Sequence, residues 1–154
     1  MAIELVREYL KTYGRDQDII ELDASSATVE LAAAALHTQP ERIAKTLSFM
    51  GKEQPLLIVC AGDSKIDNHK FKERFQVKAK MLKGTEVERY TNHAIGGVCP
   101  FAVPASTAVY FDLSLKRFDY IYPACGSSNS AIRLTCEELE TLVPQGTWVD
   151  VCKQ

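Results

Sequence analysis

The sequence predicts an α+β fold in which a mixed β-sheet or a small barrel is surrounded by helices. Three observations favour this class. Short apolar segments typical of strands are interspersed with segments of helical period. Few of these strands are followed by a helix long enough to cross back over a parallel sheet, as regular βαβ winding requires. Neither G-x-G-x-x-G nor G-x-x-x-x-G-K-[ST] occurs in the chain.

The predicted elements of the first half alternate between helices and strands. Ile3, Val6, Leu10 and Tyr13 have helical spacing, so we expect a helix over residues 2–13 that ends at Gly14. The remaining expectations are a strand at 19–22, an alanine-rich helix capped by Ser26 or Thr28, a helical turn opened by Pro40, and strands at 44–50 and 55–60 joined by a turn at 51–54.

The second half continues in the same manner. Asp67 is predicted to cap a helix to about Phe75, and Thr85 another to about Asn92. Thr135 and Glu138 form a capping box that opens a helix to about Val143. The other predicted elements are strands at 108–112, 120–123, 131–135 and 148–151, and a short helical link at 114–118.

Length and composition indicate one domain over residues 1–154. Hydrophobic residues make up 46% and charged residues 25%, which excludes wholesale disorder, collagen-like repeats and a coiled coil. The net charge of −2 argues against a uniformly basic protein that wraps nucleic acid, and we expect no DNA partner.

The five cysteines are an odd number with no C-x-x-C pair, so neither a disulfide framework nor a zinc site is expected. No metal and no cofactor is predicted. The first 14 residues carry charges throughout, and no run approaches the ~18 apolar residues of a membrane span. We therefore expect a cytoplasmic protein with no membrane partner.

Lys45 is the first candidate functional residue. Side chains alternate along a strand, so Lys45 shares one face with Leu47 and Phe49 and lies at the mouth of an apolar face. An ammonium there can bind a phosphate or carboxylate, or stabilise developing negative charge. The simpler interpretation is a lysine at a strand end whose amine reaches into water.

Residues 91–101, TNHAIGGVCPF, are the second candidate. Gly96 and Gly97 permit backbone conformations closed to other residues and let a ligand approach their N–H groups. Pro100 restricts the loop. The loop could present amides to a carbonyl oxygen, and a plain turn is the alternative.

Residues 124–134, ACGSSNSAIRL, are the third candidate. Small polar residues follow a predicted strand, so successive amides could hold a phosphate or a sugar. The segment lacks the spacing of a phosphate-binding loop, and a simple connection between strands is the alternative.

Residues 65–83 are a basic segment. They hold seven Lys and Arg residues against two acidic ones, a local charge of +5 in a chain of net charge −2. This excess suits contact with the backbone of a polyanion, although a solvated helix face has the same composition.

His93, Cys99 and Cys125 lie within these loops. Their spacing is not that of metal ligands. Cys99 with His93 as its base, or Cys125, would instead make the protein a thiol enzyme.

The order of these motifs resembles a known family. IAKTLSF, GDSKID, TNHAIGGVCPF, VYFD, YPACGSS and LTCEEL occur in the order of the YbaK/prolyl-tRNA synthetase-associated domain family, over residues 28–143. The chain resembles a freestanding member, because no synthetase sequence is attached. The resemblance implies the family's fold, a mixed sheet curled into a barrel-like core with surrounding helices.

The resemblance also implies an activity. Family members hydrolyse the ester that joins a wrong amino acid to the terminal adenosine of a tRNA, commonly alanyl- or cysteinyl-tRNA specific for proline. It follows that the chain is expected to be an aminoacyl-tRNA deacylase acting in trans. The expected partners are the acceptor end of a mischarged tRNA and an aminoacyl-tRNA synthetase.

Site residues are implied in the same way. Lys45 matches the family's functional lysine, which holds the phosphate or ribose end of the substrate and supports the transition state. Gly96 and Gly97, with Pro100, match the loop that positions the aminoacyl carbonyl. Gly126, Ser127 and Ser128 match the Gly-rich stretch at the far edge of the pocket. The predicted substrate-binding residues also include Pro100 and Cys99 and, as our own candidates for an apolar pocket, Phe49, Val98 and Phe101.

Such chemistry needs little covalent machinery, because an aminoacyl ester is already activated. Positioning, amide donors for the oxyanion and one cation can suffice. The alternative is a non-catalytic sensor or adaptor of the same fold that binds an aminoacyl or nucleotide group. This alternative is suggested by the last loop, where this chain has Ala131 and some family members carry an acidic residue.

Overall fold

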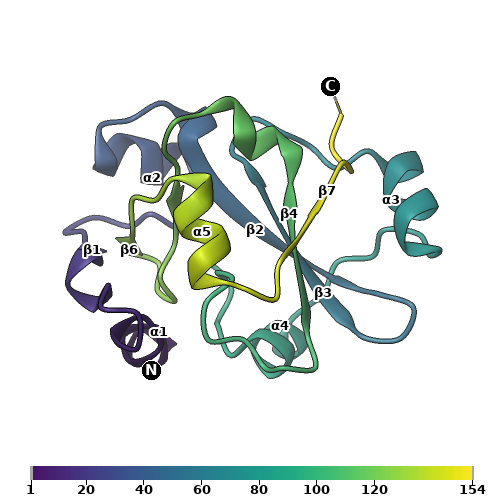
Figure 1. Cartoon of the computed structure of the whole chain (residues 1–154), viewed down its shortest axis with the longest axis horizontal. Helices are drawn as coiled ribbons and strands as arrows, with labels where there is room; N and C mark the ends of the chain where they lie inside the picture. The colour runs from purple at the N-terminus through teal and green to yellow at the C-terminus, as the bar shows by residue number, and fades with distance from the viewer. Residues whose placement is uncertain (1, 154) are drawn as a thin grey trace.

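The computed structural model describes residues 2–153 and has a five-stranded mixed sheet at its centre (Figure 1). The strand order is β5-β2-β3-β4-β7, in which β2 and β3 are antiparallel and the other three pairings are parallel. A separate two-stranded sheet pairs β1 with β6. The strands are β1 (Ile20–Glu21), β2 (Ile43–Met50), β3 (Pro55–Ala61), β4 (Ala108–Asp112), β5 (Tyr122–Pro123), β6 (Ser130–Ala131) and β7 (Thr147–Val149).

Helices cover both faces of the sheet. Helices α1 and α5 pack on one face and α3 on the other, as the packing clusters and Figure 1 agree. Among residues 2–153, no helix is both long enough and apolar enough to cross a membrane. The helices are α1 (Ala2–Lys11), α2 (Val29–Leu36), α3 (Asn68–Phe75), α4 (Thr85–Thr91) and α5 (Cys136–Leu142), with short 3₁₀ turns η1 (Asp16–Asp18), η2 (Pro40–Arg42) and η3 (Leu113–Arg117).

Strand β3 is the centre of the core because both of its faces are buried. All seven of its residues are buried, as its uninterrupted apolar sequence PLLIVCA requires. Leu57 and Val59 pack on the face covered by α1 and α5, while Leu56 and Ile58 pack on the face covered by α3. The mixed α+β class is therefore confirmed. Within residues 2–153 no pairing joins the outer strands β5 and β7, so closure into a barrel is not confirmed.

Helices α2, α3 and α5 begin where the predicted capping side chains lie. Thr28 accepts a hydrogen bond from the Leu31 amide, Asp67 caps α3, and Thr135 with Glu138 forms the predicted capping box. Thr85 is not a cap, because Gly84 takes that position with φ of +53° and Thr85 is the first helical residue. The predicted strand at 131–135 is cut to β6, since beyond it only an isolated bridge joins Leu134 to Ile121.

Asp112 joins the end of β4 to the C-terminal segment. The residue is 1% exposed, and its carboxylate accepts hydrogen bonds from the Ser114 amide at 2.8 Å and the Val151 amide at 2.9 Å. Asp112→Ala leaves both amides without this acceptor, so we expect the free energy of unfolding to fall by about 3 kcal/mol. Urea unfolding measures this, with Asp23→Ala on the exposed surface as the control for the charge change. An equal effect of the two variants would contradict the role of Asp112.

Candidate active site

A cavity of about 360 Å³ lies beside strand β2. Six consecutive β2 residues, 43–48, line it. Because side chains alternate between the faces of a sheet, a run of consecutive residues lines a cavity only where the cavity follows the edge of the strand. Helix α2 forms an opposite wall, and the loop that contains Gly96 and Val98 closes another side.

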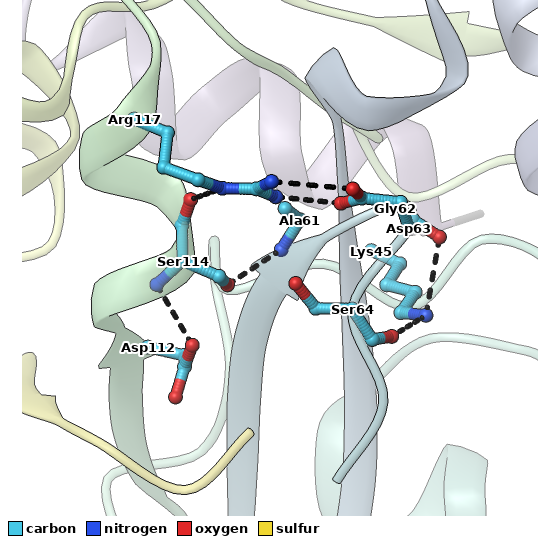
Figure 2. Close-up of polar contacts among 8 residues, drawn as sticks. All are labelled: Lys45, Ala61, Gly62, Asp63, Ser64, Asp112, Ser114 and Arg117. Atoms are coloured by element: carbon cyan, nitrogen blue, oxygen red, sulfur yellow. Dashed lines mark hydrogen bonds and ion pairs between the residues drawn. The ribbon is translucent and has the colours of Figure 1, made fainter. Parts of the chain in front are cut away.

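Lys45 lies in the cavity wall and is half-buried. Figure 2 shows its amine directed at the segment that follows β3. The Nζ atom donates to the carbonyl oxygens of Gly62, at 3.3 Å, and Ser64. Both acceptors are uncharged carbonyl oxygens, so neither forms an ion pair with the ammonium.

The segment that holds the Lys45 amine is itself anchored (Figure 2). Arg117 forms a two-pronged ion pair with Asp63, with Nη2–Oδ1 at 2.6 Å and Nη1–Oδ2 at 3.2 Å. The hydroxyl of Ser114 accepts a hydrogen bond from the Ala61 amide at 3.1 Å. The hydrogen bonds from Arg117 lower the pKa of Asp63, so this nearby carboxylate stays charged and is neutralised by Arg117.

The two predicted loops meet at Gly97. A Cβ at this position would lie 2.8 Å from the Ser127 nitrogen and 2.9 Å from the Gly126 carbonyl carbon, so only glycine fits without displacing the neighbouring backbone. The Gly97 amide donates to the Ala94 carbonyl at 3.0 Å. Gly97 thus holds the loops together, and its amide is already occupied.

Gly96 has a different position. Its φ is +96°, a conformation that favours glycine, and it lines the cavity. A Cβ here would contact Ala27 and Ser128 at 3.6 and 3.7 Å. Within residues 2–153, the Gly96 amide donates no hydrogen bond. Of the two glycines, Gly96 therefore has the amide that a ligand in the cavity could use.

The other residues of the last loop build its frame. Gly126 packs against helix α1, where a Cβ would lie 2.9 Å from the Ala2 carbonyl oxygen. The Ser127 hydroxyl bonds to Ser130 at 2.7 Å, and the Ser128 carbonyl accepts from the amide and hydroxyl of Ser26. These residues shape the loop, while its neighbours 124, 130 and 131 line the cavity.

Several predicted pocket residues lie in the core instead. Phe49 shares a face with Lys45 as expected, but α3 covers that face and the Phe49 ring lies 4.9 Å from the Phe71 ring. Cys99 and Phe101 are fully buried in the larger core cluster, and Pro100 between them is buried too. Among the predicted apolar residues, Val98 lines the cavity.

The apolar wall of the cavity comes from residues that the sequence analysis did not single out. Helix α2 contributes Val29, Ala32 and Leu36, and β5 contributes Tyr122. The available signal was the helix sequence VELAAAAL, which is apolar at every position except Glu30 and therefore offers a second apolar face to be covered. Ser26, Thr46, Ser48 and Ser130 supply polar atoms to the same cavity.

One end of the basic segment, residues 65–83, lies at the cavity, and the rest of the segment lies farther from it. Met81 and Leu82 form part of the cavity wall, and Met81 is exposed. Toward α3, the side chains of Lys72, Lys78 and Lys80 are exposed. A polyanion with one end bound in the cavity can thus contact several of these lysine side chains along its length.

The structure brings His93 and Cys99 together, with 3.4 Å between Nε2 and Sγ. Both are fully buried, and His93 Nε2 also lies 2.7 Å from the Phe101 carbonyl oxygen. A carbonyl only accepts, so Nε2 carries the proton and cannot take one from Cys99. Burial raises the pKa of Cys99 to about 12. This geometry does not support a thiol nucleophile.

Cys99 is accordingly expected to resist alkylation in the folded protein. At pH 8 a thiol of pKa about 12 is ionised in about one molecule in 10,000, and thiolate is the reactive form. Iodoacetamide labelling followed by peptide mass spectrometry should find Cys136, which is less buried, labelled first. Complete labelling of Cys99 without unfolding would contradict this reading.

Within residues 2–153, no group of three or more His, Cys, Asp and Glu side chains is arranged to hold a metal ion.

Comparisons with known proteins extend over most of the chain. A family model described as an aminoacyl-tRNA editing domain matches residues 23–142. The protein YwhH of Bacillus subtilis (strain 168), described as uncharacterized, is 49% identical over 154 residues, which are 99% of this chain and 98% of that protein. A solved structure described as a candidate trans-editing enzyme for prolyl tRNA synthetase is similar with a TM-score of 0.89 and 27% identity, covering 99% of this chain and 98% of the other. The solved hypothetical protein APE2540 is similar with a TM-score of 0.84 and 25% identity, covering 97% and 99%.

Proposed function

The chain belongs to the aminoacyl-tRNA editing domain family, and we propose that it hydrolyses the ester of mischarged tRNA in trans, as a single cytoplasmic domain over residues 1–154. The observation that carries this proposal is that Lys45 and Gly96 both line one cavity of about 360 Å³. A cation and an unoccupied backbone amide in a half-closed site are what stabilisation of an ester's oxyanion requires.

We propose a small amino acid as the group removed, such as alanine or cysteine attached to tRNA specific for proline. Ala32, Ala44, Ala124 and Ala131 line the cavity with methyl groups, which leave room for a small side chain and for the ribose. A synthetase pocket discriminates one methylene by only about 1–3 kcal/mol, so a second site selective for small groups is useful. The similarity to a candidate trans-editing enzyme for prolyl-tRNA synthetase supports this class of substrate.

The proposed reaction is a direct hydrolysis. The oxygen of a water molecule forms a bond to the ester carbonyl carbon, and the bond from that carbon to the ribose oxygen breaks. A proton from the water passes to the ribose oxygen, which leaves the free amino acid and an intact tRNA end. Lys45 counters the negative charge near the reacting ester, and no covalent enzyme intermediate is required.

The exposed lysines of residues 65–83 support contact with the acceptor stem. They continue from the cavity rim at Met81 and Leu82. Contacts of this kind bind phosphate groups without reading sequence, and salt weakens them. A synthetase that delivers the mischarged tRNA remains a proposed second partner.

Incubation with a panel of mischarged tRNAs tests the function. Loss of radiolabelled amino acid from alanyl- or cysteinyl-tRNA specific for proline is the expected result. Prolyl-tRNA, the correctly charged form of the same tRNA, is the matched control and should remain intact. Saturable tRNA binding without hydrolysis would favour the non-catalytic sensor or adaptor. A protein that neither binds nor hydrolyses any mischarged tRNA of the panel would contradict the proposed function.

A further inference from the structure

Strand β2 has a gap in its pairing along the edge that faces the cavity. At one end of this edge, β5 pairs only with Ile43 and Ala44. At the other end, the Ser48 carbonyl accepts from the Leu82 amide at 3.1 Å. Thr46 lies between them, and no hydrogen bond to its backbone amide or carbonyl on this edge occurs within residues 2–153.

The register of the β2–β3 hairpin fixes the direction of these Thr46 groups. In an antiparallel pair, facing residues alternate between hydrogen-bonded and non-hydrogen-bonded positions. Gly51 and Gln54 form a hydrogen-bonded position, with the Gly51 amide 2.9 Å from the Gln54 carbonyl. Counting back along β2, odd-numbered residues bond to β3, and Thr46, opposite Val59, does not. Its N–H and C=O therefore point away from β3, into the cavity.

The side chain of Thr46 is not the group that meets a ligand. Its hydroxyl oxygen is sealed from solvent and has no hydrogen-bond partner within the described chain. Because Thr46 nevertheless lines the cavity, its unpaired backbone N–H and C=O are the groups that a bound molecule could reach.

We propose that the Thr46 edge of β2 binds the α-aminoacyl group of the substrate as one residue of an added antiparallel strand pair. An aminoacyl ester has the same N–Cα–C=O unit as a strand residue. Two facing residues in a hydrogen-bonded position exchange both N–H···O=C bonds. The substrate ammonium thus donates to the Thr46 carbonyl, and the Thr46 N–H donates to the ester carbonyl oxygen.

This arrangement, which rests on the proposed function, gives the Thr46 amide a catalytic role. The ester oxygen that it contacts becomes negative when water attacks, so the hydrogen bond strengthens in the transition state. It also defines the chemical class of the substrate. An α-aminoacyl ester forms both bonds, whereas an ester without the α-amine forms only one.

Replacement of the Thr46 amide by an ester tests the role of the N–H. Incorporation of the α-hydroxy analogue of threonine at position 46 removes the donor and keeps the side chain. We expect kcat/KM for deacylation to fall about 100-fold. The α-hydroxy analogue of methionine at Met50 is the control, because it removes an amide on the same edge outside the cavity and weakens a carbonyl bonded to β3 in the same way. Equal activity of the two ester variants would overturn the proposal.

A binding measurement separates this proposal from the proposed function. The probe is 3′-deoxy-3′-alanylaminoadenosine, in which an amide replaces the scissile ester. We expect its titration to shift the ¹⁵N–¹H signal of Thr46, and the propionyl analogue, which lacks the α-amine, to bind at least 10-fold more weakly. An unmoved Thr46 signal at saturation, equal affinity of the two analogues, or no binding of either would overturn the proposal. A shifted signal in a protein that deacylates no tRNA would support the subsite and reject the enzyme.

Discussion

Replacing Lys45 by glutamine is expected to lower kcat/KM for deacylation by about 100- to 1,000-fold. The substitution keeps a hydrogen-bond donor near Gly62 and Ser64 but removes the positive charge from the cavity. Loss of one preorganised group that stabilises transition-state charge has an effect of this size. The measurement is single-turnover hydrolysis of the mischarged tRNA identified by the panel.

The control for Lys45→Gln is Lys52→Gln, which makes the same charge change on an exposed turn far along the β2–β3 hairpin. We expect Lys52→Gln to leave the rate within about twofold, because an exposed charge at this distance is screened by salt. A Lys45→Gln enzyme with near-normal kcat/KM would remove the central cation from the proposed mechanism.

Gly97→Ala is expected to lose most of the deacylation activity and to destabilise the fold. The added methyl group would lie 2.8 Å from the Ser127 nitrogen, so the two loops must move apart. Overpacking of this kind lowers the free energy of unfolding by about 1–3 kcal/mol. The same movement displaces Gly96 and residues 124, 130 and 131, which line the cavity.

Gly146→Ala separates these two effects. Its Cβ would lie 2.2 Å from Phe111, so it also disturbs packing, but it does so away from the cavity. At a temperature where both variants are folded, as circular dichroism would verify, only Gly97→Ala should have a reduced kcat/KM. Similar activity of the two variants would show that the loop contact does not shape the site.

The sequence predicted local structure best where one side chain determines it. The Thr135–Glu138 capping box and the Asp67 cap follow from bonds within a single helical turn. The N-cap of α4 is Gly84 and not the predicted Thr85. The backbone at the cap position has a positive φ, and a prediction based on capping side chains does not detect this. Barrel closure depends on how distant strand edges meet, which local periodicity does not encode.

The candidate site likewise contains residues that local motifs identify and residues that only tertiary packing places there. Lys45 and Gly96 were predicted from motifs and line the same cavity, while their roles stay a prediction. Phe49 lies under α3, because the covering of a strand face depends on tertiary packing. The residue type of Thr46 does not identify it as a candidate binding residue. Its significance comes from where β5 ends and where residues 80–82 begin to pair with β2, and these boundaries belong to the folded chain.

The ion pair of Arg117 with Asp63 has an electrostatic consequence for the neighbouring lysine. Because Arg117 holds the adjacent carboxylate in an ion pair, the hydrogen-bond partners of the Lys45 amine within residues 2–153 are neutral carbonyls, and its positive charge is not consumed by an ion pair. A cavity lined by such a charge attracts any small anion that fits. Inorganic phosphate or sulfate in an assay buffer would therefore compete with the 3′ end of the tRNA, and measured turnover would depend on the choice of buffer as well as on ionic strength.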